Sequence, residues 1–359
     1  MINVTSPFLP PKEEYQIYLD KIYKKNWLTN MGPLSNELEI RLKDYLGTKN
    51  LLYVGNGTIA LQLAIKALNL SGEIITTPFS YVATTSSIVW EQCIPVFADI
   101  NEKSFNIDPH KIEVLISERT TAILATHVFG NPCDIESIEK IAEKHDLKVI
   151  YDAAHCFGVN YKGQSIFNYG DISTVSFHAT KLFHTIEGGA VITQSKELDF
   201  RLTKMRNFGH VTSESFDGMG INAKNSEFHA AMGLCNLKYI EGILKKRKDQ
   251  YINYLNQLKG CPLGFQQISD NTNYNYAYFP VVFDSETIAL KVKEKLQDNW
   301  IGTRRYFYPS LSNLEYVKSY KTPIADSIAS RILCLPVFHE LSEEDQDFIC
   351  YILKSTLTS

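Results

Sequence analysis

The sequence of 359 residues contains no apolar run of the roughly 20 residues that a membrane-spanning helix needs. It also has no extended Lys/Arg block, and its net charge is −4, so neither a nucleic-acid-binding nor a membrane-binding surface is indicated. The opening residues MINVTSPFLPP have neither a charged start nor an apolar stretch, so we expect no secretory signal. These absences predict a soluble protein of the cytoplasm.

A disulfide framework and a zinc site are not indicated either. The seven cysteines are odd in number and scattered, and no two form a Cys-x-x-Cys pair. Such thiols are typical of a reducing compartment. His178 and His184 lie close in sequence, but no third ligand stands at a compact spacing, so we predict no metal centre.

What the sequence does have is a succession of short runs rich in Val, Ile, Thr and Ala. Helical patterns such as DIESIEKIAEKHDL fall between them. Apolar character that is continuous rather than alternating is typical of strands covered on both faces. The pattern therefore predicts an α/β fold with a mostly parallel, helix-covered sheet. The seven predicted strands lie within residues 51–54, 73–78, 94–100, 121–128, 148–154, 173–178 and 189–193.

The length exceeds what one hydrophobic core usually supports, so we expect two domains. Residues 1–250 would form the large domain with an N-terminal arm, and residues 251–359 a smaller α+β domain. A continuous helical pattern over 227–258 would bridge them. In the small domain, YNYAYFPVVF and GTRRYFYP look like strands, and EEDQDFICYILKS looks like a closing helix.

The stretch VGNGTIALQLA places a glycine-rich turn between a strand and a helix. Gly57 lets the backbone turn sharply, and Thr58 would be the N-cap of the helix. A helix N-terminus with free amides and a hydroxyl binds phosphate, although many such turns are plain connections.

Two further residues point to one cofactor. Asp152 follows a buried strand, at the sheet end where α/β proteins bind ligands, and an ionised carboxylate there needs a cationic or donor partner, unless it only caps the next turn. Lys181 lies in a short turn between two apolar strands, where the ordinary interpretation is a solvated loop. Pyridoxal phosphate needs a phosphate cradle, an acid for its ring nitrogen and a lysine for its aldehyde. Ser176 would add a phosphate hydrogen bond, and Tyr81 would stack on the ring.

The stretches GNGTIAL, TTPFSYVATTSSI, YDAAHCFG, GDISTVSFHATK, EGGAVIT and GINAKNSEFHAAMG, in this order, resemble the DegT/DnrJ/EryC1/StrS sugar aminotransferases. The resemblance covers about residues 5 to 310. It implies the fold type I, aspartate-aminotransferase-like architecture, with a seven-stranded sheet in the large domain. It also implies pyridoxal phosphate as the cofactor and a homodimer with shared active sites.

Carried over by position, the resemblance gives each residue a role. Lys181 would hold the cofactor and move the proton, and Asp152 would pair with the ring nitrogen. Asn222 would reach the phosphate of the partner's cofactor. Gly57, Thr58 and Ser176 would bind phosphate, Tyr81 would stack on the ring, and His155 would lie near the ring's phenolic oxygen.

The sequence departs from the family pattern in two places. The family usually has Asn-x-Arg-Met where this chain has Asn222-Ala223-Lys224-Asn225, which leaves the role of Lys224 open. His184 stands where small polar residues are commoner, and we interpret it as structural.

The resemblance implies transfer of the amino group of L-glutamate to a nucleotide-linked keto-sugar. The stretches HATKLFHTIEGGA and WLTNMGPLSNELE favour C4 of dTDP-4-keto-6-deoxy-D-glucose, giving dTDP-4-amino-4,6-dideoxyglucose for O-antigen or other surface glycans. Amination at C3, or of a UDP- or GDP-linked sugar, stays open. A sugar dehydratase of the same family would carry histidine in place of Lys181, and a non-catalytic regulator would not need Lys181, Asp152 and Tyr81 together.

Overall fold

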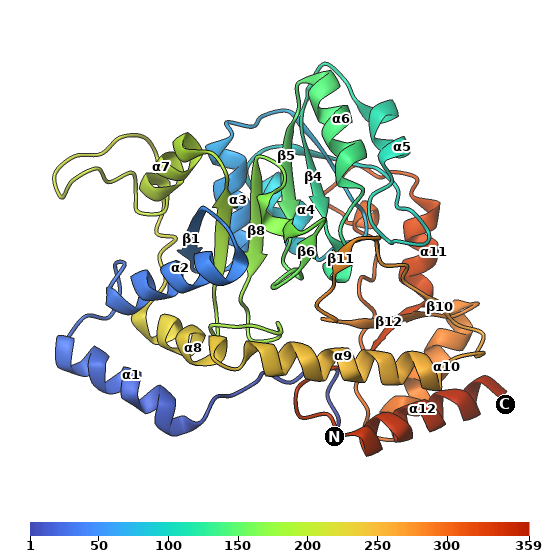
Figure 1. The fold of residues 1–359 in the computed structure, drawn as a ribbon. Coiled ribbons are helices and arrows are strands. Elements are labelled where there is room, and N and C mark those ends of the chain that lie inside the picture. The colour runs from blue at the N-terminus through green and yellow to red at the C-terminus, as the bar shows by residue number, and fades with distance from the viewer. Residues whose placement is uncertain (359) are drawn as a thin grey trace.

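The computed structural model describes residues 1–358, and its centre is a seven-stranded sheet. The strand order is β1-β9-β8-β5-β4-β2-β3, and only β9 is antiparallel to its neighbours (Figure 1). The predicted mostly parallel sheet and all seven of its strands are confirmed. Their bounds are β1 Asn50–Val54, β2 Glu73–Thr76, β3 Ile94–Phe97, β4 Thr120–Thr126, β5 Lys148–Asp152, β8 Ile172–Ser176 and β9 Gly189–Thr193.

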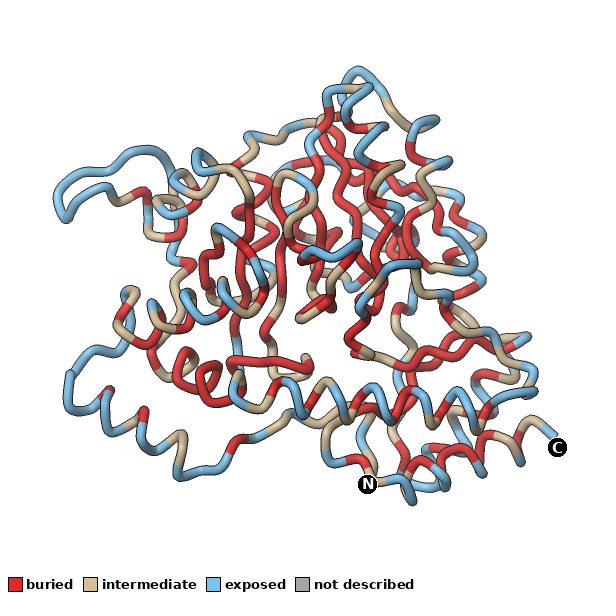
Figure 2. Tube along the Cα trace, viewed as in Figure 1, coloured by how far each residue is buried: buried red, intermediate tan, exposed pale blue. Residues whose placement is uncertain are grey.

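Helices cover both faces of this sheet, which explains why its strands are apolar throughout. Along β5, Ile150 faces one hydrophobic core and Tyr151 the other. The first core is closed by α3 Gly57–Ala67, α4 Val82–Trp90 and α7 Lys196–Met205. The other core packs against α1 Lys12–Lys25, α2 Pro33–Leu46, α5 Pro109–Ile112, α6 Ile135–His145 and α8 Glu227–Leu237. Figure 2 accordingly shows the strands buried and the outer helical surfaces exposed.

The C-terminal part of the chain has a core of its own, built on a three-stranded antiparallel sheet. Its order is β10-β12-β13, and the helices α9 and α12 pack with it on one shared core. A second small sheet joins β11 to the β6–β7 pair. The bounds are β6 Asn160–Tyr161, β7 Gln164–Ser165, β10 Gly264–Phe265, β11 Thr272–Asn273, β12 Phe279–Val282, β13 Ile332–Leu335, α9 Ile240–Gln257, α10 Glu286–Asp298, α11 Pro323–Arg331 and α12 Glu343–Thr358. The division into two domains near residue 250 stays a prediction, and it would fall inside α9.

The predicted continuous helix over 227–258 is wrong, because the chain forms two helices, α8 and α9. The break lies at Lys238–Tyr239, where the amides of both residues bond three residues back instead of four. The Tyr239 hydroxyl donates to Glu14 on α1, which fixes the turn. In Figure 1, α9 then runs across the lower part of the molecule, above α12, toward the small sheet.

Two predicted strands of the small domain also need correction. Of YNYAYFPVVF only Phe279–Val282 is a strand. The preceding backbone is held against the loop that follows β5, because the Asn275 side chain donates to the carbonyls of His155 (2.8 Å) and Phe157 (3.0 Å). The stretch GTRRYFYP forms no strand beyond a single bridge between Arg304 and Cys334. The closing helix is confirmed as α12.

Candidate functional site

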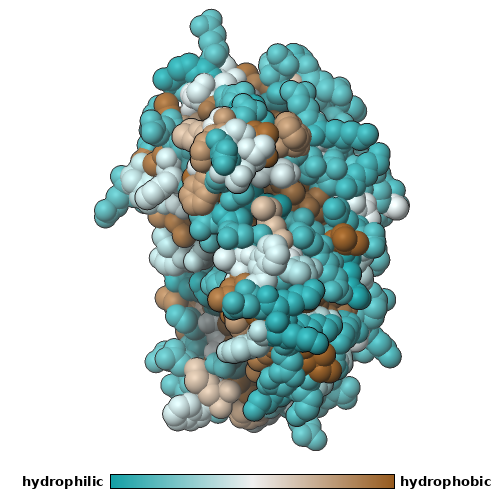
Figure 3. Space-filling view, turned by 90° about the vertical axis from the view of Figure 1, so that its left-hand side faces the viewer, coloured by the Kyte–Doolittle hydropathy of each residue, from teal (hydrophilic) through white to brown (hydrophobic). Residues whose placement is uncertain are grey.

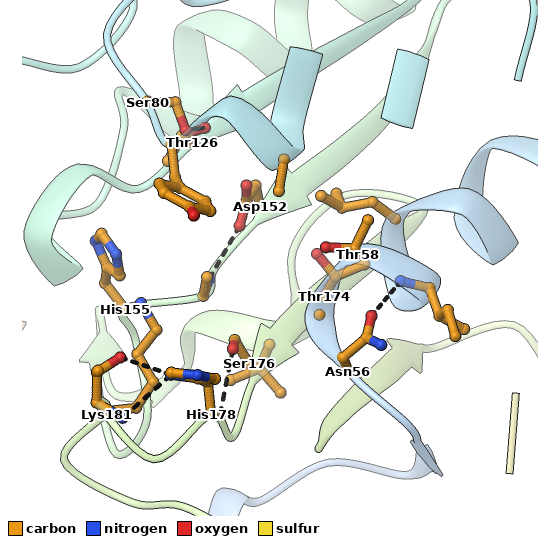
Figure 4. A pocket seen from close by; sticks show the side chains of 18 of the residues that line it. Asn56, Thr58, Ser80, Thr126, Asp152, His155, Thr174, Ser176, His178 and Lys181 are labelled. Carbon is orange, nitrogen blue, oxygen red and sulfur yellow. Dashed lines mark hydrogen bonds between the residues drawn. The ribbon is translucent and has the colours of Figure 1, made fainter. Parts of the chain in front are cut away.

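A cavity of about 580 Å³ lies at the carboxyl ends of the parallel strands. In-register pairing brings Thr126 of β4, Asp152 of β5 and Thr174 of β8 side by side at this edge. Seven of the eight residues that the sequence predicts for the site line this cavity. They are Gly57, Thr58, Tyr81, Asp152, His155, Ser176 and Lys181 (Figure 4).

The N-terminus of α3 forms one wall. The N-cap is Asn56, whose side chain accepts from the amide of Ile59 at 2.8 Å, so the prediction of Thr58 as N-cap is wrong. Thr58 lies in the first turn, lining the cavity together with the turn's backbone. Asn56 is the better cap because it immediately precedes the first helical residue, Gly57, and its backbone is extended.

Two glycines allow this helix end to approach the sheet closely. A Cβ on Gly57 would meet the Cβ of Ser176 at 3.0 Å, and a Cβ on Gly189 would meet the backbone carbon of Asn56 at 2.6 Å. This close approach explains why Gly189, the second residue of the pair Gly188-Gly189 after the lysine turn, is a glycine. The amides of α3 and the hydroxyls of Thr58 and Ser176 thus line one cavity, a donor set suited to a phosphate.

Asp152 is buried at the end of β5, with 5% of its surface exposed. Its Oδ2 accepts from Thr84 Oγ1 at 2.7 Å, and its Oδ1 accepts from the amide of Ala154 at 3.1 Å. Burial raises the pKa of this carboxyl above its usual range, while the two hydrogen bonds and the charge of Lys181 act in the opposite direction. Among residues 1–358 it forms no ion pair, so a cation in the cavity would find an uncompensated carboxylate.

Lys181 lies in the turn between β8 and β9, and its amide donates to the carbonyl of His178. The Nζ donates to the hydroxyl of Tyr278 at 3.2 Å. Burial lowers the pKa of the Lys181 amine, and the Arg304 cation adds to this, against the opposing effects of Tyr306 and Asp152. A lysine of lowered pKa whose amine donates to a neutral hydroxyl suits covalent chemistry and proton transfer.

His155 is buried beside the rings of Phe129 and Phe307, with centroids 6.1 and 5.8 Å away. Its Nδ1 accepts from the amide of Phe129 at 3.2 Å, which assigns the proton to Nε2. Burial lowers the pKa of this imidazole well below its usual value, so the ring is neutral. His155 therefore offers one N–H donor to a ligand.

A chain of hydroxyls that sequence reasoning missed lies behind Asp152. Thr126 Oγ1 donates to Ser80 Oγ at 3.0 Å, Ser80 Oγ lies 2.8 Å from Thr84 Oγ1, and Thr84 donates to Asp152. The sequence feature that could have indicated this hydroxyl chain is the run of hydroxyl-bearing residues around Tyr81. Tyr278, Arg304 and Tyr306 were also missed, because their segments were interpreted as plain strands.

Asn222, the eighth predicted residue, is exposed and lies outside the set that lines the cavity. Its role toward a partner subunit stays a prediction. Lys224 places its Nζ 4.7 Å from the ring of Phe208. His184 is buried with Nε2 2.7 Å from the carbonyl of Phe8, while its Nδ1 accepts from the amide of Ile186, so this histidine ties the N-terminal arm to the lysine turn.

These residues fit pyridoxal phosphate. The uncompensated carboxylate of Asp152 matches a protonated ring nitrogen, and the amine of Lys181 matches the aldehyde. The donors at α3 and Ser176 match the phosphate. In the view of Figure 4, Lys181 and His155 lie on one side of the cavity and Thr58 on the other, with Asp152 between them.

Comparisons with known proteins agree with this fit. The sequence profile of the DegT/DnrJ/EryC1/StrS aminotransferase family matches residues 11–354. A dTDP-4-amino-4,6-dideoxy-D-glucose transaminase of Escherichia coli is 42% identical over 96% of this chain and 95% of its own. A protein of the same name from Shigella dysenteriae is 41% identical over 97% of both chains. Among solved structures, DesI in the presence of its TDP-sugar product superposes with a TM-score of 0.95, at 30% identity over 99% of this chain and 93% of that one.

Proposed function

This chain belongs to the DegT/DnrJ/EryC1/StrS aminotransferase family, and from that membership we propose that it transfers the amino group of L-glutamate to C4 of dTDP-4-keto-6-deoxy-D-glucose. The product is dTDP-4-amino-4,6-dideoxyglucose, a precursor for O-antigen or other surface glycans. The cofactor is pyridoxal phosphate. The observation that carries the choice of substrate is the identity of 42% and 41%, over nearly the full chain, to two transaminases of that name.

When bound, pyridoxal phosphate supplies an aldehyde that takes up the donor's amine and a ring that withdraws electrons from the substrate carbon. Residues of this chain would bind the cofactor and move the protons. Asp152 would hold the charge of the ring nitrogen, and the donors at α3 and Ser176 would hold the phosphate. Lys181 Nζ takes the proton from the substrate carbon of the donor and delivers one to C4 of the sugar in the second half-reaction. His155 would offer its Nε2–H as a hydrogen-bond donor to the cofactor's phenolic oxygen.

The alternatives differ in specific features. A dehydratase of this family would lack the lysine, so Lys181 favours transamination. A regulator that binds the cofactor without turnover would not need both the uncompensated Asp152 and the Lys181 amine of lowered pKa. C3 amination and UDP- or GDP-linked substrates share the same cofactor chemistry, so only the product separates them.

A product assay tests the substrate. The holoenzyme is incubated with L-glutamate and a panel of dTDP-, UDP- and GDP-linked keto-sugars, and products are identified by mass and proton spectra. We expect turnover to be fastest with dTDP-4-keto-6-deoxy-D-glucose and the new amine at C4. An amine at C3, or preference for another nucleotide, would replace the proposed substrate while leaving the reaction class intact.

A dimer with shared sites is part of the proposal. It is supported by the segment that follows α7, which projects from the molecule in Figure 1. Large apolar side chains of this segment are exposed. Figure 3 views the molecule from that side, and brown hydrophobic residues lie among teal hydrophilic ones on its surface. Exposed apolar groups of this kind mark interfaces, and two-fold dimers are the commonest closed assembly. The exposed apolar residues of the segment are Phe208, Val211, Phe216, Met219 and Ile221.

Mixing two inactive variants tests the shared site. We expect Lys181→Ala and Asn222→Asp each to lower turnover as homodimers, the second by placing a negative charge beside the partner's phosphate. A mixed dimer would carry both defects in one site and leave the other intact, so activity should recover to about half of the wild-type value. Verified mixed dimers without recovery, or a fully active monomer, would contradict the arrangement.

We also propose that the protein is located in the cytoplasm, where nucleotide-sugars and glutamate are available as substrates. All seven cysteines lie within the described residues as free thiols, in keeping with a reducing compartment. No helix of residues 1–358 is both long and apolar enough to cross a bilayer.

A further inference from the structure

The turn between Lys181 and β9 contains a β-branched residue in the left-handed region of backbone conformation. Ile186 has a φ of 70°, which is rare for an isoleucine, and 40% of its surface is exposed, so core packing does not explain the conformation. Backbone strain of this kind persists only where the surroundings hold it, and it concentrates at functional sites. Ile186 directly precedes Glu187, a residue that lines the cavity. The strained turn therefore sets where this carboxylate lies.

Hydrogen bonds hold this turn on both sides. The Nδ1 of His184 accepts from the amide of Ile186 at 3.2 Å, while its Nε2 donates to the carbonyl of Phe8 at 2.7 Å. His184 is buried, and burial lowers the pKa of its imidazole, so the ring is neutral and Nδ1 can accept. On the other side of the turn, the carbonyl of Glu187 accepts from Asn225 Nδ2 at 2.8 Å. The fold thus fixes the backbone that carries Glu187.

A second histidine faces the Glu187 carboxylate. The Nε2 of His178 lies 3.5 Å from Glu187 Oε1, and both residues line the cavity. The Nδ1 of His178 accepts from the amide of Thr180 at 3.2 Å, which assigns the ring proton to Nε2. The two side chains are 45% and 53% exposed, and a pair so exposed contributes little to stability. Stability therefore does not explain why the chain fixes this carboxylate, whereas contact with a ligand would.

The two substrates of the proposed function differ in the charge that they present to this carboxylate. Each carboxylate of L-glutamate would be repelled by Glu187. The sugar ring of the keto-sugar is neutral, and its hydroxyl next to the reacting carbon can donate to a carboxylate. Glu187 and Lys181 line the same cavity, so this hydroxyl would lie in the space that the carboxylate faces. Glu187 therefore suits the sugar and not the amino acid.

We propose that His184 is a positioning residue, which holds the Ile186 turn and so places the Glu187 carboxylate where a hydroxyl of the keto-sugar donates to it. This inference rests on the proposed function and names how the sugar is recognised. The Nε2–H of His178 orients the carboxylate. Because the contact is to the sugar alone, it acts in the second half-reaction and not in the first.

The two half-reactions isolate this contact. The cofactor's absorbance reports conversion, first with L-glutamate and then, once the cofactor carries the amino group, with the keto-sugar. We expect Glu187→Gln to lower the second-order rate constant for the keto-sugar roughly 10- to 100-fold, the usual effect of losing a charged hydrogen bond. The rate constant for glutamate should stay within about threefold of the wild-type value, because only an exposed charge is removed from its path.

Variants of His184 separate positioning from folding. His184→Ala should lower the rate constant for the keto-sugar roughly 10-fold and keep that for glutamate. His184→Asn retains a carbonyl oxygen that can accept from the amide of Ile186, so it should keep most of the reactivity with the keto-sugar. His110→Ala is the matched control, since His110 is exposed and does not line the cavity, and it should keep both rates. Thermal unfolding of each variant reports its stability.

A double variant shows whether His184 acts through Glu187. If it does, His184→Ala added to Glu187→Gln should lower the rate constant for the keto-sugar by about threefold or less beyond the single Glu187 variant. Losses that multiply in the double variant would give the two residues independent roles and would contradict the inference.

Binding gives a readout independent of turnover. The probe is dTDP-glucose, which carries sugar hydroxyls but no ketone to aminate, titrated calorimetrically into the holoenzyme. Its Kd should rise roughly 10-fold in Glu187→Gln and in His184→Ala. The Kd of dTDP, which lacks the sugar, should stay constant in both variants.

Several results would overturn the inference. One is a Glu187→Gln variant that reacts with the keto-sugar at the wild-type rate. Another is a loss of glutamate reactivity as large as the loss with the keto-sugar, which would assign the carboxylate to the cofactor or to the fold. If His184→Ala does not fold, His184→Asn decides, because lost reactivity with the keto-sugar at an unchanged Tm would exclude the positioning role. Failure of the proposed function is a different outcome, since the wild-type holoenzyme would then show no absorbance change with either substrate.

Discussion

Replacing Lys181 by alanine is expected to abolish amino transfer, lowering kcat by at least roughly 10⁴-fold. The reason is that one side chain performs two tasks, since its Nζ holds the cofactor and later moves the proton. Its surroundings suit both, because burial lowers the pKa of the amine and, among residues 1–358, its one side-chain hydrogen bond is to the neutral hydroxyl of Tyr278. The measurement is steady-state turnover with L-glutamate and the keto-sugar.

Lys162→Ala is the matched control for this loss. Lys162 is an exposed lysine that pairs with Glu136, and neither residue lines the cavity, so its removal should leave turnover unchanged. Thermal unfolding of both variants separates lost chemistry from lost folding. Turnover retained by Lys181→Ala would remove this lysine from the mechanism.

Asp152→Asn is expected to slow the half-reaction with glutamate by roughly 10²- to 10³-fold, the effect of leaving one partner of a buried charge pair unmatched. Both hydrogen bonds to this carboxylate come from neutral donors, and no second carboxylate in the described part of the chain, residues 1–358, bonds to these donors in its place. The cofactor should still bind through the phosphate donors. Single-turnover absorbance after mixing with glutamate measures the rate, and an unchanged rate would exclude Asp152 from the site.

The same variant should not unfold the cofactor-free protein. Burial raises the pKa of Asp152 in the folded chain, so the folded state favours its protonated form. The stability contributed by such a group is fully present below the unfolded-state pKa and is lost as the pH rises through the folded-state pKa. At neutral pH asparagine removes that cost, so the Tm of cofactor-free Asp152→Asn should equal or exceed that of the wild type.

The parts of the fold that depend on buried periodicity could be predicted from the sequence. Strands covered on both faces must be apolar along their whole length, so β2, β4 and β5 were visible as continuous runs. Asp152 and Lys181 were visible for the opposite reason, as charged residues directly beside such runs. Seven of the eight predicted site residues line one cavity because these strands end at one edge of the sheet.

What could not be predicted depends on contacts between distant segments. The break between α8 and α9 is fixed by Glu14, more than 200 residues earlier in the chain. Thr58 and Asn56 are both good N-caps, and only the position where the helix begins decides between them. Arg304 and Tyr306 carry a strand-like pattern, but their segment turns toward the cavity after one bridge to Cys334, so their place in the site is a tertiary property.

The central claim is that the cavity around Lys181 holds pyridoxal phosphate and that this lysine is bonded to it. Borohydride reduction of the holoenzyme, followed by proteolysis and mass mapping, tests it most directly, because reduction makes the bond between the cofactor and its lysine permanent. We predict the added cofactor mass on the peptide that contains Lys181 and on no other. Cofactor mass on a different lysine, or an active holoenzyme in which Lys181 stays unmodified after reduction, would contradict the account.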